Sequence, residues 1–119
     1  MAVADIPVEL ILAHPLFDDV RQGLAEIFEE DLDELVLFGS MAIGRAHADS
    51  DIDLLIVLDR EHVKPILELS NIGPLIAKMN LMYDELLAPV IVSKRNWVAP
   101  PTNPLLIEIK KHGKSIWKK

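Results

Sequence analysis

The sequence contains no cysteine, which excludes disulfide bonds and thiolate metal sites and fits a reducing compartment. Aromatic residues are also scarce, at 5% of the chain, although half of all residues are hydrophobic, so the core must be mainly aliphatic. No stretch approaches the ~20 consecutive apolar residues that cross a bilayer. The N-terminus lacks a basic region followed by an apolar stretch and a cleavage site. These absences predict a cytoplasmic protein.

Basic residues are few: 12 Lys and Arg stand against 19 Asp and Glu, which gives a formal net charge of −7. Nucleic-acid surfaces rely on clustered Lys and Arg, so this balance argues against an extended nucleic-acid interface. An acidic surface can instead dock a basic partner protein, because complementary fields speed association. A length of 119 residues predicts one domain over residues 1–119.

Apolar residues recur at helical spacing in several stretches. Helices are predicted at residues 15–30, 63–83 and 105–112, the last ended by Gly113. The second helix is expected to break at Gly73 and Pro74, because proline removes a helix hydrogen bond. Residues 1–7 are expected to form a loose tail, and residues 8–13 form an apolar run whose structure the pattern does not fix.

Short apolar runs between these helices indicate β-strands. Strands are predicted at residues 35–38, 52–58, 86–92 and 115–117, with one helical turn at residues 41–45. The second strand is nearly continuous in branched aliphatics, as expected when both faces are covered. Pro89 favours an edge position for the third strand, because proline cannot donate to the ladder. This order predicts an α/β (α+β) domain with helices packed on a small mixed β-sheet.

The chemistry of the chain is concentrated between the first two strands, within residues 35–58. Asp51 and Asp53 are two residues apart at the start of the second strand, so both side chains can point to one face and converge on a cation. The N–H groups around Gly39 and Ser40 begin a helical turn, where unpaired donors stabilise phosphate oxygens. Together these features predict a phosphate cradle facing a divalent-metal site, which is the chemistry of nucleotide handling.

This motif resembles the glycine–serine and paired-aspartate signature of the DNA polymerase beta-like nucleotidyltransferase superfamily. At this size the chain is similar to the minimal nucleotidyltransferase (MNT) family, whose members are often encoded beside a small helical HEPN-domain protein as a toxin–antitoxin pair. The motif covers residues 38–54, and the remainder fits the family only as an order of helices and strands. The residues that carry the resemblance are Gly39, Ser40, Ala42, Gly44 and the run at residues 50–54.

The resemblance implies a polymerase beta-like fold and Mg²⁺-dependent transfer of a nucleoside monophosphate, AMP from ATP, to a protein acceptor. It further implies an antitoxin whose partner is a HEPN-domain toxin. In this account Asp51 and Asp53 are the catalytic residues and hold the Mg²⁺ ion. The residues expected at the nucleotide are Gly39, Ser40, Gly44, Arg45 and Ser50, with Ser50 capping or bracing the loop rather than reacting.

Two departures from the superfamily pattern leave a second interpretation open. The superfamily usually supplies a third carboxylate from a later strand, but residues 86–92 contain no acid. Asp84 and Glu85 lie just before that strand and are candidates, with solvation at a helix end as the alternative. The MNT motif often has arginine where this chain has Ile43, and Arg45 is the nearby substitute. The alternative is a catalytically degenerate module that neutralises or scaffolds a partner protein by binding.

Simpler interpretations compete with the remaining features. Clustered acids such as Asp51 and Asp53 are often only a solvated loop. Trp97 and Trp117 are expected to anchor the C-terminal segments. The lysines near the C-terminus form a solvated tail by default. An exposed edge of the third strand offers a route to a homo-oligomer, unless a terminus covers it.

Overall fold

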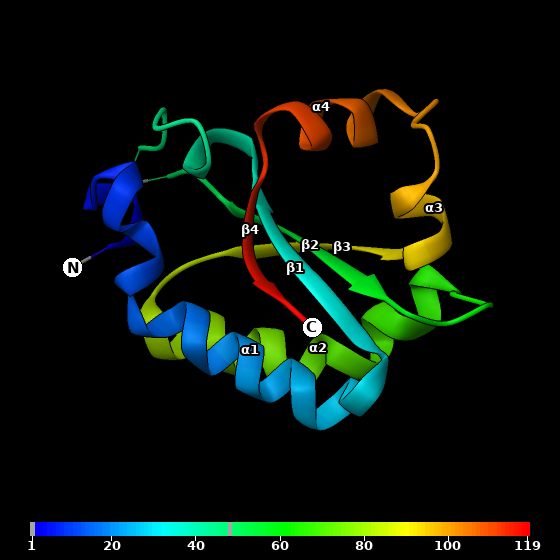
Figure 1. Cartoon of the computed structure of the whole chain (residues 1–119). Helices are drawn as coiled ribbons and strands as arrows, with labels where there is room; N and C mark the ends of the chain where they lie inside the picture. Colours follow the sequence, from blue (N-terminus) through cyan, green and yellow to red (C-terminus); the bar gives the residue numbers. More distant parts are fainter. Residues whose placement is uncertain (1, 48) are drawn as a thin grey trace.

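The computed structural model describes residues 2–47 and 49–119 and contains a four-stranded sheet (Figure 1). Its strands are β1 (Leu32–Phe38), β2 (Ile52–Leu58), β3 (Leu87–Ser93) and β4 (Lys114–Lys118), in the order β3-β2-β1-β4. β1 pairs antiparallel with β2 and with β4, whereas β2 and β3 are parallel. The sheet is therefore mixed, as predicted, and β3 with its proline occupies an edge.

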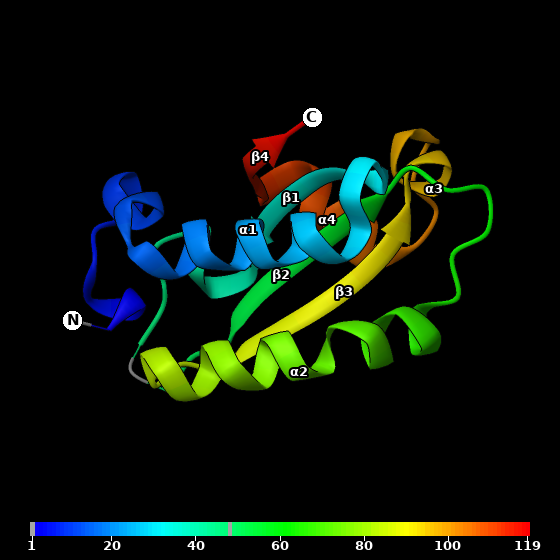
Figure 2. The ribbon, with the colours of Figure 1, turned by 90° about the horizontal axis from the view of Figure 1, so that it is seen from below.

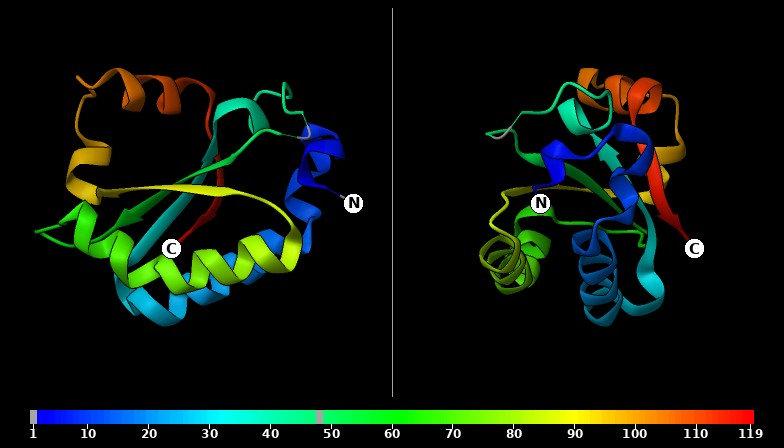
Figure 3. Two further views of the ribbon diagram at one scale, coloured as in Figure 1. Left: turned by 180° about the vertical axis from the view of Figure 1, so that it is seen from behind. Right: turned by 90° about the vertical axis from the view of Figure 1, so that its left-hand side faces the viewer.

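Helices cover both faces of this sheet (Figures 1 and 3). α1 (Pro15–Phe28) and α2 (Pro65–Tyr83) lie side by side on one face, and α2 connects the parallel strands β2 and β3 (Figure 2). α3 (Lys94–Val98) and α4 (Pro104–His112) lie on the other face. No described helix is long and apolar enough to span a bilayer.

The two faces of the sheet contain separate hydrophobic clusters. Along β2, Leu54 and Ile56 belong to the cluster beneath α1 and α2, while Leu55 and Val57 belong to the cluster beneath α3 and α4. This division explains why β2 is a continuous aliphatic run, since both of its faces are covered. By the same alternation, Asp53 lies on the α3 and α4 side of the sheet.

The N-terminal segment is not the loose tail that was expected. It forms two 3₁₀ segments, η1 (Val3–Asp5) and η2 (Val8–Ala13). Val3 is 0% exposed and packs within the cluster beneath α1 and α2. Burial of this apolar side chain holds the segment in place. The prediction of a loose tail did not take this burial into account.

The expected break in the second helix is also wrong, because α2 runs uninterrupted through Pro74. Pro74 leaves the carbonyl of Ser70 without its helix donor, and Ser70, Gly73 and Pro74 are all exposed, so this interruption lies on the solvent side of the helix. Ile72 and Met79, before and after this point, are both buried against the core. Packing on both sides of the proline therefore holds the helix together.

β1 begins at Leu32, three residues before the predicted start, and α3 is a helix that the sequence pattern does not predict. The two differences are connected, because α3 supplies partners for the charged residues at the start of β1. Asp33 and Glu34 in β1 are buried charged residues, which a hydrophobic pattern assigns to a loop. Lys94 of α3 places Nζ 3.2 Å from Oδ1 of Asp33, and the Nε1–H of Trp97 donates to Oε1 of Glu34 at 3.2 Å. The charges in β1 are thus compensated by a helix five residues long.

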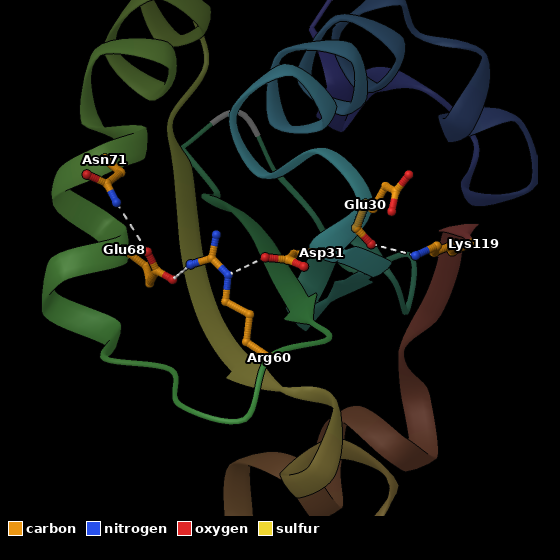
Figure 4. A network of polar contacts seen from close by, with 6 residues as sticks. All are labelled: Glu30, Asp31, Arg60, Glu68, Asn71 and Lys119. Atoms are coloured by element: carbon orange, nitrogen blue, oxygen red, sulfur yellow. Dashed lines mark hydrogen bonds and ion pairs between the residues drawn. The ribbon is translucent and has the colours of Figure 1, made fainter.

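A polar network joins the end of β2 to α2 and to Asp31, the residue before β1 (Figure 4). Nε of Arg60 donates to Oδ2 of Asp31 at 2.7 Å, and the same guanidinium pairs with Glu68 of α2. Glu68 is 4% exposed and also accepts a hydrogen bond from Nδ2 of Asn71 at 3.2 Å. The Arg60 guanidinium lies 5.3 Å from the centre of the Phe28 ring. The network therefore fixes the end of β2 that is farthest from Asp51.

Candidate functional site

The register of β1 against β2 brings the glycine–serine turn onto the aspartates. Phe38, the last residue of β1, pairs with Asp53, the second residue of β2. The chain therefore leaves β1 at Gly39 directly beside Asp53. Asp51 is exposed and Asp53 partly buried, and Ile52 between them is 0% exposed and points into the opposite core. The two carboxylates share the face that Ile52 does not.

Gly39 is in contact with the carboxylate of Asp53. Its φ is +72°, a left-handed conformation that favours glycine. A Cβ built on Gly39 would lie 2.1 Å from Oδ2 of Asp53, so any larger residue would displace that carboxylate. Glycine is therefore required at this position both for its conformation and for the close approach of the carboxylate to the backbone.

The turn after Gly39 differs in position from the helical turn expected at residues 41–45. It is a 3₁₀ segment, η4 (Gly39–Met41), which begins two residues earlier. The N–H of Ala42 donates to the Gly39 carbonyl at 3.1 Å, and the N–H of Arg45 donates to the Ser40 carbonyl at 3.0 Å. The positive φ of Gly39 starts the turn as soon as β1 ends, so the segment is shorter and tighter than the expected helical turn.

Ser50 braces the loop that leads from this turn to Asp51. Its Oγ accepts a hydrogen bond from the N–H of His47 at 2.9 Å, and its own N–H donates to the His47 carbonyl at 2.9 Å. Nδ1 of His47 accepts from the N–H of Asp49 at 3.3 Å. These contacts support the predicted bracing role of Ser50 and assign His47 to the same local structure.

Burial, followed by the negative charge of Asp51, raises the pKa of Asp53 above its ordinary value. The ionised form of Asp53 is therefore disfavoured in the metal-free site, and a nearby cation would stabilise it. Among the described residues, no three His, Asp or Glu side chains are grouped closely enough to enclose a metal by themselves. Two carboxylates suit Mg²⁺, which keeps several waters and is commonly completed by the phosphates of a substrate.

The structure does not place a third carboxylate opposite Asp53. The residue paired with Asp53 on β3 is Ala88. Asp84 and Glu85 instead border a hollow of about 280 Å³ that is also lined by Asp51. Asp84 has a φ of 52° and ends α2, as the alternative of a helix-end position predicted. These two acids therefore flank Asp51 from outside rather than complete the pair.

Gly44 and Arg45 follow the η4 turn, and their expected place at the nucleotide stays a prediction. Gly44 has a φ of +73°, and the nearest atoms to a Cβ built there belong to Val8, at 3.7 Å. Its conformation serves the turn, and its neighbours are in the N-terminal segment. Arg45 is exposed and forms no ion pair with any residue in the described part of the chain. Neither residue contacts the carboxylates.

Leu86 is a positioning residue that sequence reasoning did not single out. Its carbonyl accepts a hydrogen bond at 2.8 Å from the N–H of Ile52, the residue between the two aspartates. This bond fixes the backbone at the start of β2. The bond involves only main-chain atoms, so no pattern of side chains in the sequence indicates this bond. It becomes visible only once the parallel pairing of β2 and β3 is known.

Comparison with known protein families identifies the domain. The nucleotidyltransferase domain pattern matches residues 18–113, a range that includes the turn and both aspartates. The chain belongs to the nucleotidyltransferase domain family. Membership makes the chain a nucleotidyltransferase by class. In this nucleotidyltransferase, the two carboxylates beside the glycine–serine turn are groups suited to metal and phosphate.

Two relatives come from Methanocaldococcus jannaschii. The nucleotidyltransferase is 29% identical over 79 residues to "Putative protein adenylyltransferase MJ0141", which covers 66% of this chain and 78% of the relative. It is 28% identical over 94 residues to "Putative protein adenylyltransferase MJ1305", covering 79% of this chain but only 64% of that protein's length. Both relatives thus carry names that specify AMP transfer to protein.

A solved structure described as a toxin–antitoxin with AMP-PNP has the same fold. The TM-score is 0.59 at 20% identity, and the superposition covers 86% of this chain and 73% of that one. At this identity the likeness establishes the arrangement of strands and helices. The polymerase beta-like fold predicted for this nucleotidyltransferase is therefore confirmed.

Proposed function

We propose that the protein is a Mg²⁺-dependent nucleotidyltransferase that transfers AMP from ATP to a protein acceptor, as the antitoxin of a HEPN-type toxin. The observation that carries this proposal is the contact between Gly39 and the Asp53 carboxylate. This contact places a backbone turn suited to phosphate next to a side chain suited to Mg²⁺. A nucleoside triphosphate complexed with Mg²⁺ presents both of these groups together.

Each residue of the site has a role in this proposal. Asp51 and Asp53 hold Mg²⁺, which when bound supplies positive charge to the triphosphate. Gly39 allows the backbone to approach the phosphates, and Ser40 offers its hydroxyl and its N–H to a phosphate oxygen. Ser50 keeps the loop before Asp51 in position through its bonds to His47. The reaction joins an acceptor hydroxyl oxygen to the α-phosphorus and releases pyrophosphate.

A protein acceptor is supported by the names of the relatives and by the charge of this chain. Both relatives are named as protein adenylyltransferases. A net charge of −7 opposes a nucleic-acid acceptor and favours docking of a basic protein. The HEPN-type toxin follows from the resemblance to the MNT family, and the structural neighbour described as a toxin–antitoxin agrees with it.

One observation favours a second candidate function, a module that neutralises its partner by binding alone. Ala88 lies opposite Asp53, where a neighbouring strand would place a third carboxylate. Without that group the protein has less to activate an acceptor hydroxyl. The two functions differ in one respect that can be measured, which is whether nucleotide is transferred when the partner is neutralised.

The test uses α-³²P-labelled ATP, Mg²⁺, the purified protein and the product of the adjacent gene. We expect label on the partner protein with the native chain and none with Asp51→Asn/Asp53→Asn. Lys78→Gln, on the outer surface of α2, is the matched control and should label the partner as the native chain does. Neutralisation by the folded double variant without any labelling by the native chain would overturn the enzyme proposal in favour of the binding module.

A further inference from the structure

A cavity lies at the end of the sheet opposite the aspartates. Its volume is about 540 Å³, and it is enclosed by the segment between β2 and α2 and by the start of α3. The parallel strands β2 and β3 end side by side (Figure 2), and Ser93, the last residue of β3, lines the cavity. Crevices at the carboxyl ends of parallel strands commonly bind ligands in α/β proteins. The polar residues of its wall are Glu61, His62, Lys64, Ser93, Arg95 and Asn96.

Two cations of this wall lack partners. Lys64 and Arg95 are exposed, and within the described part of the chain neither has an acidic oxygen within 4 Å. They come from different elements, Lys64 from the segment before α2 and Arg95 from α3, yet they line one cavity. Two unpaired cations on one concave wall create a local positive potential in a protein whose net charge is −7.

Three acids near this cavity are paired with other cations. Asp31 and Glu68 both pair with Arg60 (Figure 4). Asp33 pairs with Lys94, the residue before Arg95, at 3.2 Å. The only acid on the cavity wall is Glu61, and it forms no ion pair with any described cation. The wall therefore carries two cations against one acid, and neither cation is paired with it.

We propose that this cavity binds the phosphate group of a small phosphorylated molecule through Lys64 and Arg95. Arginine binds phosphate through its planar fork of donors and lysine as a point charge. Asn96 adds amide donors, and the buried Ser93 has an O–H to donate, since its Oγ already accepts from the N–H of Asn96 at 3.2 Å. Apolar wall residues such as Ile91 can contact the uncharged part of the ligand.

The test is an NMR titration of ¹⁵N-labelled Asp51→Asn/Asp53→Asn protein without divalent metal, using inorganic phosphate and AMP as separate probes. This background removes the aspartate pair, and the inference does not rest on the proposed transferase function. We expect the amide resonances of residues 61–64 and 93–96 to shift and those of residues 39–44 to stay in place. Tighter binding of AMP than of phosphate would support a phosphorylated organic ligand, and equal binding would support free phosphate.

Substitutions of basic and acidic wall residues should change the affinity for phosphate in opposite directions. Lys64→Gln/Arg95→Gln should weaken phosphate binding by about tenfold or more, since each charged hydrogen bond contributes substantially. Glu61→Gln should strengthen it about two- to fivefold by removing the opposing charge. Lys78→Gln on the outer face of α2 should leave it unchanged. Absence of shifts at residues 61–64 and 93–96 with both probes, or equal affinity in the Lys64→Gln/Arg95→Gln variant, would overturn the proposal.

Discussion

Oδ2 of Asp53 occupies the space that a side chain on Gly39 would need. A Cβ built on Gly39 would lie 2.1 Å from that oxygen, and the φ of Gly39 is +72°. The contact arises because Phe38 and Asp53 are paired across β1 and β2. A turn and an acid that are 14 positions apart in the sequence are thus held together by strand register, and the site depends on this pairing.

Gly39→Ala should abolish binding of MgATP and lower the free energy of unfolding by about 1–3 kcal/mol, the usual cost of a strained backbone. The added methyl group must displace the Asp53 carboxylate, since the two cannot share the space. Calorimetric titration with MgATP and chemical denaturation measure the two effects. Gly73→Ala is the matched control, because no atom outside its chain neighbours and the backbone of its own helix lies within 4 Å of the Cβ built there. It should retain MgATP binding, and its free energy of unfolding should change by less than ~1 kcal/mol, since the helix propensity of alanine is offset by crowding against Pro74. Native affinity in Gly39→Ala would contradict the geometry.

Asp53→Asn should make the metal-free protein slightly more stable at neutral pH. Because burial and Asp51 raise the pKa of Asp53, the folded state binds its proton more tightly than the unfolded state does. Its contribution to stability is therefore most favourable below the ordinary pKa of 3.8 and falls as the pH rises through the folded pKa. The amide is neutral throughout and avoids this loss. Melting temperatures in EDTA should be a few degrees higher for the variant at pH ~7 and converge near pH ~4.

Addition of Mg²⁺ and ATP should reverse that order. The ligands bind the folded native protein and raise its melting temperature, whereas Asp53→Asn has lost a metal ligand and should respond little. If Asp53→Asn is less stable than the native protein in EDTA at neutral pH, the Asp53 carboxylate stabilises the fold. That result would contradict its assignment as a metal ligand whose charge is unfavourable without metal.

Arg60→Met should destabilise the protein by about 1–3 kcal/mol, below the cost of breaking a fully buried pair because Arg60 is partly exposed. The substitution leaves the carboxylate of Glu68, which is 4% exposed, with only the amide of Asn71 as a partner. Chemical denaturation measures the change. In a double-mutant cycle, Glu68→Leu added to Arg60→Met should recover part of the loss. Additive losses would show that the two residues are not coupled.

Ser50→Ala should weaken MgATP binding severalfold without a measurable change in melting temperature. The hydroxyl accepts from the N–H of His47 at 2.9 Å in an exposed loop, so its loss loosens the approach to Asp51 but removes little from the core. Ser50→Thr retains an acceptor oxygen and should bind as the native chain does. A loss in Ser50→Ala as complete as that in Asp53→Asn would instead indicate direct contact with the nucleotide.

The fold was predictable where local patterns carry it. β2 has the predicted bounds because branched aliphatics fill both faces of a central strand. The uninterrupted path of α2 was not predictable, since the burial of Ile72 and Met79 that holds it through Pro74 comes from tertiary packing. α3 is too short for a periodic pattern. Its one local indication is Ser93, whose Oγ accepts from the N–H of Asn96 as an N-cap.

The site was predictable in its residue types and only partly in its arrangement. The spacing of Asp51 and Asp53 fixes their common face, and the structure places Gly39 beside them. The register that pairs Asp53 with Ala88 depends on residues far apart in the sequence, and no local pattern specifies it. For the same reason, the position of Gly44 next to Val8 could not be anticipated.

The central claim is that the glycine–serine turn and the aspartate pair form one nucleotide site. Calorimetric titration of the native chain with ATP, in the presence and absence of Mg²⁺, tests it most directly, with folded Asp51→Asn/Asp53→Asn as the comparison. We predict Mg²⁺-dependent binding by the native chain that the double variant loses. Equal binding by both proteins, or no binding by the native chain even with its partner protein present, would contradict the claim.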